Sequence, residues 1–307
     1  MSPGRLIPIA GSAVLLVALA MLLPLAEIWR GLGAVPVEVW LLAVGGFLAC
    51  HGLGALKWSR MLEVAAVRLR FRNVLRYYLA GLAGNLMLPS VIGGDVISVG
   101  LAARRADNSA GAILGSVLNR LLDAGALALF VAIGLAALPG GLVALNIDLP
   151  WNWLAVAVLA VVLLGGFGIP AALRRLPRRQ RVHLRQATRA IVGQPLPILA
   201  AFGLGVAMQA GLIALTILLG TAVGLELPLS VWLMAWALAK LAAFLPISQA
   251  GIGTREVAFA IAIAPFGAPP SLAVAAALAW NAVLVCGCAL AGLLAGLIPP
   301  AGVSSES

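Results

Sequence analysis

Long runs of apolar residues, interrupted by short polar or basic stretches, dominate the sequence. A membrane-spanning helix needs roughly 20 apolar residues at about 1.5 Å rise each, and six runs are long enough. They cover residues 6–28, 38–56, 110–138, 151–173, 196–222 and 271–297. No stretch alternates apolar and polar residues as the strands of an outer-membrane barrel do. The pattern therefore predicts an all-α polytopic membrane protein with about six full spans.

Two further apolar segments, residues 77–100 and 230–267, contain residues that interrupt helices. The interruptions are Leu88-Pro89-Ser90 with Gly93-Gly94-Asp95 in the first segment, and Leu245-Pro246 with Gly251-Ile252-Gly253 and Arg255-Glu256 in the second. Proline and paired glycines break helices, and the backbone groups freed at membrane depth need protein or water as partners. We therefore expect each segment to form a re-entrant hairpin or a broken helix.

These elements follow the same order in both halves of the chain. Residues 1–150 contain span, span, hairpin and span, and residues 151–300 repeat that order from the opposite face. Inverted repeats of this kind are typical of transporters, whose broken helices meet near the bilayer midplane. We predict one transmembrane domain over residues 1–300, built from two inverted repeats, and a short tail at 301–307. The alternative is coincidence, since Leu-Pro is a common dipeptide in such a composition.

Composition and charge agree with membrane insertion. Of the 307 residues, 63% are hydrophobic and 10% are charged, whereas soluble domains have about 25% charged residues. Two clusters, residues 57–76 and 174–189, hold six and seven of the 20 basic residues. Positive loops stay in the cytoplasm, so we expect both clusters and the N-terminus there, in a plasma (inner) membrane protein. Such clusters attract anionic lipids, and we expect no nucleic-acid partner.

Several kinds of active site are missing from the sequence. It has no P-loop and no His-Glu-x-x-His motif, and its three cysteines lie in apolar runs. Gly93-Gly94-Asp95 is close to the Gly-x-Gly-Asp motif of intramembrane aspartyl proteases, but Ile92 replaces the first glycine. We therefore expect a transporter rather than an enzyme, with no cofactor and no metal.

Ionisable residues within or beside the predicted membrane segments are the candidate functional groups. They are Asp95, Arg120, Asp123, Lys240, Arg255 and Glu256. An unpaired charge at the bilayer centre costs about 2.5–3.5 kcal/mol on insertion scales, so these groups need partners or water. Three are basic and three acidic, so complete pairing is possible.

Their spacing suggests how they are arranged. Arg120 and Asp123 are three residues apart and can share a helix face. Arg255-Glu256 opens the helix after the second break, where the helix dipole favours an anion. Asp95 has the equivalent place after the first break and could instead cap that helix. Each charge is either a structural ion pair or a contact with a substrate or ion.

Two amides, Asn85 and Gln249, flank the breaks and could bond to freed backbone groups or to a substrate. The candidate substrate-binding residues are therefore Asn85, Asp95, Arg120, Asp123, Lys240, Gln249, Arg255 and Glu256.

Three stretches of the sequence carry a resemblance to a known family. They are Asn85-Leu86-Met87-Leu88-Pro89-Ser90-Val91-Ile92-Gly93-Gly94-Asp95, Ser116-Val117-Leu118-Asn119-Arg120-Leu121-Leu122-Asp123, and Leu245-Pro246-Ile247-Ser248 through Gly251-Ile252-Gly253-Thr254-Arg255-Glu256. With them the chain resembles, over nearly its whole length, the lysylphosphatidylglycerol synthase transmembrane-region family of flippase-like proteins. The resemblance implies that Asp95 and Arg255-Glu256 belong to two re-entrant motifs and that Arg120 is the basic residue of the following helix.

The resemblance also implies a substrate class. The best-known members flip aminoacylated phosphatidylglycerol, and others are linked to polyprenyl-phosphate sugars or to unidentified lipids. Members often carry an arginine shortly after the first acid, where this chain has Val96-Ile97-Ser98, so head-group recognition can differ here. No stretch corresponds to the soluble aminoacyl-transferase domain of the fused enzymes, so we expect no synthesis of lysyl lipid.

The leading hypothesis is a lipid flippase or scramblase that moves a polar or anionic lipid, either an aminoacylated phospholipid or a polyprenyl-phosphate-linked lipid, between leaflets. Its partners would be membrane lipids, anionic or modified in the head group. One alternative is an ion-coupled secondary transporter of a small polar solute. Another is a non-catalytic membrane partner of a lipid-modifying enzyme, in which the charges only stabilise broken helices.

Overall fold

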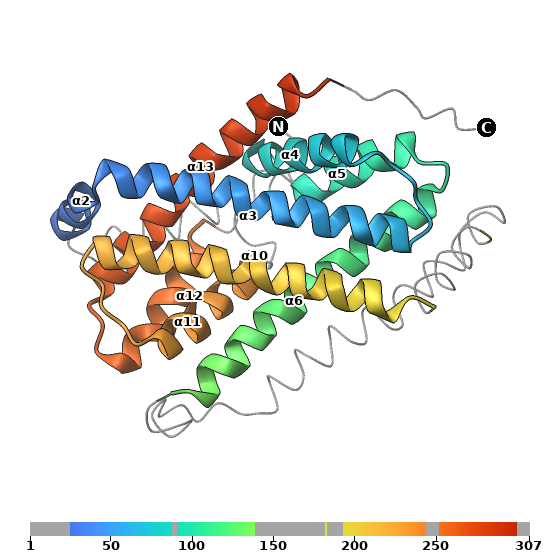
Figure 1. Cartoon of the computed structure of the whole chain (residues 1–307). Coiled ribbons are helices and arrows are strands. Elements are labelled where there is room, and N and C mark those ends of the chain that lie inside the picture. The colour runs from blue at the N-terminus through green and yellow to red at the C-terminus, as the bar shows by residue number, and fades with distance from the viewer. Residues whose placement is uncertain (1–24, 88–90, 139–181, 183–192, 244–251, 300–307) are drawn as a thin grey trace, which may run out of the picture.

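The computed structural model describes residues 25–87, 91–138, 182, 193–243 and 252–299 (Figure 1). Every regular element in these ranges is a helix. In chain order they are α2 (Leu25–Ala34), α3 (Val37–Val64), α4 (Phe71–Met87), α5 (Val91–Arg105), α6 (Ser109–Ala136), α10 (Pro195–Ala222), α11 (Leu229–Ala242), α12 (Thr254–Ile263), the short 3₁₀ helix η4 (Ala264–Phe266) and α13 (Pro270–Leu297).

Within the described residues, four helices are long and apolar enough to cross a membrane, namely α3, α6, α10 and α13. Each has 28 residues, or about 42 Å of helix, which exceeds the roughly 30 Å hydrocarbon core. They match four of the six predicted spans. The predicted end of one span, at residue 56, was wrong, because α3 continues to Val64.

The other predictions for the long segments fall partly or wholly beyond the part of the chain that the structure describes. Most of the first predicted span, the whole of 151–173, nearly all of the basic cluster 174–189 and the tail 301–307 lie outside the described residues.

The segment 77–100 forms two helices that fold back on each other. In this pair, α4 and α5 pack side by side (Figure 1), with Gly81 facing Ser98 and with the backbone N–H of Gly94 donating to Asn85 Oδ1 at 3.0 Å. Tyr77 near the start of α4 and Ala102 near the end of α5 belong to one hydrophobic cluster. The two helices are therefore antiparallel, and this segment is a helical hairpin.

The segment 230–267 forms a second antiparallel pair, α11 and α12. The ring of Phe259 on α12 stacks on Trp232, with centroids 5.3 Å apart, and meets Trp236 edge-on at 5.2 Å. Gly253 begins α12 at φ +94°, a left-handed conformation that favours glycine.

The two hairpins begin at opposite ends of the bundle. At one end, Val67 after α3 packs in the same cluster as Ala102 near the end of α5. At the other end, Gly134 near the end of α6 packs against Ser230 and Met234 at the start of α11. Figure 1 shows the same arrangement, with α4 and α5 well separated from α11 and α12.

The helix α13 lies at the centre of the molecule. Of its most apolar window 61% is buried, against 28–33% for the other three long helices. Its buried side is rich in alanine, and small residues let helix backbones approach closely within a membrane. Large apolar side chains such as Leu199 and Leu293 are exposed instead, as expected where lipid is the solvent. The core therefore holds both hairpins against one central helix.

Candidate substrate cavity

A cavity of about 160 Å³ lies between the two hairpins and the four long helices. Five ionisable residues proposed from the sequence line it, namely Asp95, Arg120, Asp123, Lys240 and Arg255. Arg120 lies about 16 Å along α6 from Ser109, and Gln209 lies about 21 Å along α10 from Pro195. In helices of about 42 Å, both positions are near mid-length. The cavity is therefore deep within the bundle.

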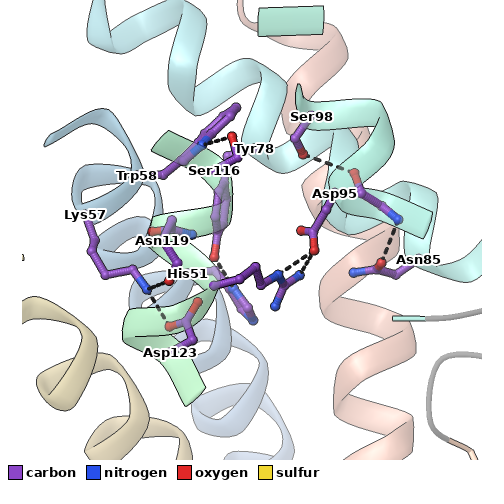
Figure 2. A network of polar contacts seen from close by, with 12 residues as sticks. His51, Lys57, Trp58, Tyr78, Asn85, Asp95, Ser98, Ser116, Asn119 and Asp123 are labelled. Carbon is purple, nitrogen blue, oxygen red and sulfur yellow. Dashed lines mark hydrogen bonds and ion pairs between the residues drawn. The ribbon is translucent and has the colours of Figure 1, made fainter. Parts of the chain in front are cut away.

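An ion pair joins Lys57 on α3 to Asp123 on α6, and Asp123 lines the cavity (Figure 2). The Lys57 side chain is 1% exposed, and its ammonium also donates to the backbone carbonyl of Asn119 at 3.4 Å. Asp123 is buried as well. Two charges removed from lipid and water in this way stabilise each other, and neither tolerates loss of its partner.

A second ion pair joins Arg120 on α6 to Asp95 on the first hairpin. Their side chains are 37% and 33% exposed, so this pair faces the cavity rather than being enclosed by packing. Asn85, on the other helix of the hairpin, bonds to the backbone of Gly94 beside Asp95. Figure 2 shows Asp95 pointing away from the α4–α5 contact and toward α6. This pair is thus the accessible one.

The charged residues of the second hairpin are held by α13. Asn281 donates to Glu256, and its Oδ1 accepts from Arg255 Nη1 at 3.0 Å. Glu256 is fully buried, and its other oxygen accepts from the backbone N–H of Gly253 at 2.6 Å, which caps α12. Arg255 lines the cavity, whereas Glu256 behind it has a structural role in the helix start.

Lys240 contributes the fourth basic group. It lies in the last turn of α11, and its Nζ donates to Gln209 Oε1 on α10 at 2.6 Å. Gln209 is 3% exposed and also lines the cavity. A cation on the second hairpin is therefore bonded to a neutral amide.

Aromatic and hydroxyl groups complete the polar wall. The Nδ1 atom of His51 is 3.0 Å from the hydroxyl of Tyr78, and Trp58 Nε1 donates to Ser116 Oγ at 2.9 Å (Figure 2). These contacts link α3 to α4 and α6. They fix the side of the cavity next to the first hairpin.

The structure brings most of the sequence-predicted residues to this one cavity. Of the eight, Asn85, Asp95, Arg120, Asp123, Lys240 and Arg255 line it, and Glu256 lies directly behind Arg255. Gln249 lies outside the described residues.

Three details of the sequence interpretation were wrong or incomplete. Arg120 and Asp123 bond to Asp95 and Lys57 on neighbouring helices, so the proximity of two residues on α6 did not identify their partners. Asp95 does not cap α5, because that helix begins at Val91 and the carboxylate lies beyond its first turn. Lys57, assigned to a cytoplasmic basic loop, is instead a buried residue of α3.

Two polar groups were missed by sequence reasoning, namely Gln209, which lines the cavity, and Lys57, which pairs with the lining residue Asp123. Lys57 follows a long apolar run without a break, and the continuing helical pattern up to Val64 was the available signal. Gln209 is an isolated strongly polar residue within the apolar run 196–222, where an amide needs a partner. Neither feature of the sequence identifies the residue to which the polar side chain bonds.

The fold and the cavity define a polytopic α-helical membrane protein with charged residues brought together between its helices. A family model described as the lysylphosphatidylglycerol synthase TM region matches residues 6–292, and the chain belongs to that family. No curated protein and no solved structure matched the chain. Family membership supports a membrane role that concerns lipids.

Proposed function

We propose that this protein is a lipid flippase or scramblase, which moves a lipid with a polar or anionic head group between the two leaflets. The observation that carries the proposal is the cavity near mid-depth, lined by charges from both hairpins. Membership in a lipid-related membrane family agrees with it.

The physical task of such a protein is to lower the cost of moving a head group through hydrocarbon. A lipid crosses slowly because its head group must leave water, while its acyl chains remain in an apolar medium throughout. The cavity, at about 160 Å³, fits a head group and not a whole lipid. The chains would therefore stay in the bilayer while the head group exchanges water for protein partners.

The pair Arg120–Asp95 is where we place that exchange. Both side chains are partly exposed to the cavity, so an incoming phosphate can compete with Asp95 for the Arg120 guanidinium. When the lipid leaves, Asp95 returns to Arg120, so neither of these two charges is left unpaired. Without an ATP site in the sequence, direction would come from a gradient or from consumption of the lipid on one side.

The inverted repeat and the membrane orientation belong to the same proposal. Hairpins that begin at opposite ends of the bundle support two repeats of opposite orientation, which give access to the cavity from each leaflet in turn. We place the N-terminus and both basic clusters in the cytoplasm and the protein in the plasma (inner) membrane. The basic clusters would concentrate anionic lipids at the cytoplasmic surface of the membrane, beside the protein.

Head-group exchange in liposomes tests the function. Purified protein should accelerate the loss of fluorescent phosphatidylglycerol signal from the inner leaflet when an impermeant reducing agent is added outside. Asp95→Asn should slow exchange by about tenfold, equivalent to about 1.4 kcal/mol of barrier, because no carboxylate then remains to displace the phosphate from Arg120 when the lipid leaves. The control is Glu63→Gln, the same change of carboxylate to amide in an exposed pair with Arg60 outside the cavity.

Two results would contradict the proposal. One is a rate equal to that of protein-free vesicles across a panel of anionic, zwitterionic and aminoacylated lipids. The other is gradient-driven uptake of a small polar solute that does not depend on the lipid, which would indicate a secondary transporter instead.

A further inference from the structure

The Lys, Arg, Asp and Glu side chains that the structure describes in and around the cavity, seven in all, do not balance in charge. Lys57, Arg120, Lys240 and Arg255 are basic, whereas Asp95, Asp123 and Glu256 are acidic. The sequence suggested three of each, and the seventh residue, Lys57, changes that count. Four cations and three anions cannot all be paired.

Lys240 is the cation that remains. Lys57 pairs with Asp123 and Arg120 pairs with Asp95, while Asn281 joins Arg255 to Glu256. In the described part of the chain, no carboxylate lies within salt-bridge distance of Lys240, and its oxygen partner is the amide of Gln209.

Lys240 lies where its positive charge can contact a ligand in the cavity. Lys240 at the end of α11 and Arg255 at the start of α12 both line the cavity, so the second hairpin presents two cations to it. The first hairpin presents Asp95, which Arg120 neutralises. An ammonium has three N–H donors, and Gln209 accepts one of them, so donors remain for a ligand.

We propose that Lys240 and Gln209 form an anion-binding subsite and that the lipid accepted by this cavity has a head group of net negative charge, such as a phosphodiester. The proposal rests on the proposed function and narrows its substrate. A phosphate oxygen accepts from Lys240 while the amide N–H of Gln209 can donate to a second oxygen. A head group of net positive charge, such as that of aminoacylated phosphatidylglycerol, is disfavoured because it adds a cation to a site that already has one too many.

Binding in detergent tests this subsite separately from transport. Native mass spectrometry would compare phosphatidylglycerol, phosphatidylcholine and ethyl-phosphatidylcholine, which share a glycerophosphate backbone but have charges of −1, 0 and +1. The expected order of occupancy is phosphatidylglycerol, then phosphatidylcholine, then ethyl-phosphatidylcholine. Lys240→Met should weaken phosphatidylglycerol binding by about tenfold or more, because a charge-assisted hydrogen bond to the phosphate is lost, and Lys240→Arg should largely retain it.

A second variant keeps the test independent of folding. Gln209→Glu has nearly the same shape and gives Lys240 a carboxylate, so the protein should remain folded while the excess charge disappears. We expect it to lose the preference for phosphatidylglycerol over phosphatidylcholine. Arg60→Met removes one positive charge from an exposed pair on α3 and should leave the preference unchanged.

The outcomes separate the two proposals. Wild-type preference for ethyl-phosphatidylcholine, or an unchanged lipid preference in folded Gln209→Glu, would overturn the subsite. Selective phosphatidylglycerol binding without any acceleration of lipid exchange would support the subsite and overturn the flippase. Equal acceleration of all three lipids, with Gln209→Glu behaving as wild type, would support lipid exchange and overturn the subsite.

Discussion

At the scale of single residues, the pair Lys57–Asp123 illustrates how charges persist in this bundle. Both groups are buried, and replacing one alone leaves the other without compensation in a medium of low dielectric constant. Replacing both removes the desolvation cost together with the attraction. The two kinds of change should therefore differ greatly in effect.

We expect Lys57→Met to lower the free energy of unfolding by about 3–5 kcal/mol, because Asp123 becomes a buried unpaired charge. The double variant Lys57→Met, Asp123→Leu should recover most of that loss. Unfolding of the detergent-solubilised protein, followed in a double-mutant cycle, measures both. Additive losses in the double variant would show that the pair is not coupled in this way.

The identity of these residues was partly predictable. An ionisable side chain within an apolar run is conspicuous in the sequence, and this feature identified Asp95, Arg120 and Lys240. Their partners were not predictable, since Lys57 and Asp123 are 66 positions apart and meet only because α3 packs on α6. Spacing along one helix describes only neighbours on that helix.

At the scale of elements, close packing of α4 on α5 depends on small residues where the helices meet. A Cβ atom added at Gly81 would be 2.7 Å from the backbone carbonyl oxygen of Gly94, and it would also collide with the Ser98 hydroxyl. Backbone atoms cannot move aside without separating the helices. By contrast, a Cβ at Gly100 on α5 would have no atom within 4 Å other than those of its chain neighbours and its own helix backbone.

Gly81→Ala should therefore destabilise the protein by about 1–3 kcal/mol, the usual cost of overpacking. Gly100→Ala is the matched control and should be neutral or slightly stabilising, because alanine favours a helix more than glycine. Thermal unfolding in detergent compares the two. Equal stability of both variants would contradict the close contact between α4 and α5.

The two breaks were the features that the sequence predicted most directly, because proline interrupts a helix and the freed backbone groups need partners at membrane depth. The prediction that Gly93-Gly94 also interrupts the helix was wrong, since both glycines lie within α5. The exact ends were harder. A helix can continue beyond an apolar run where neighbouring helices supply partners for its polar side chains. The helix α3 therefore continues beyond residue 56 and includes Lys57, which pairs with Asp123. Local composition does not contain that information.

At the scale of the whole molecule, the two hairpins enter the bundle from opposite ends. This arrangement predicts which loops lie on each side of the membrane. The loop after α3 and the end of α5 lie at one end, and the loop between α10 and α11 lies at the other. If the basic clusters are cytoplasmic, the first end faces the cytoplasm and the second faces outward.

Single-cysteine labelling in intact cells measures this orientation. In a background without the native cysteines, Glu226→Cys should react with an impermeant thiol reagent added outside. Arg68→Cys and Arg104→Cys should react only after permeabilisation, and all three positions are exposed. Labelling of Arg68→Cys and Arg104→Cys from different sides would mean that 77–100 crosses the membrane, against the hairpin.

The two hairpins hold their acids very differently. Glu256 is enclosed and bonded to both Gly253 and Asn281, whereas Asp95 is open to the cavity. In the proposed flippase, the second hairpin would be rigid and the first would move more easily. A lipid would therefore cross unequal energy barriers between the cavity and each of the two leaflets. Such asymmetry changes how fast lipids exchange between each leaflet and the cavity. It cannot by itself produce net transport, since a passive protein accelerates movement in both directions by the same factor. Any lasting imbalance between leaflets would have to be maintained elsewhere in the cell.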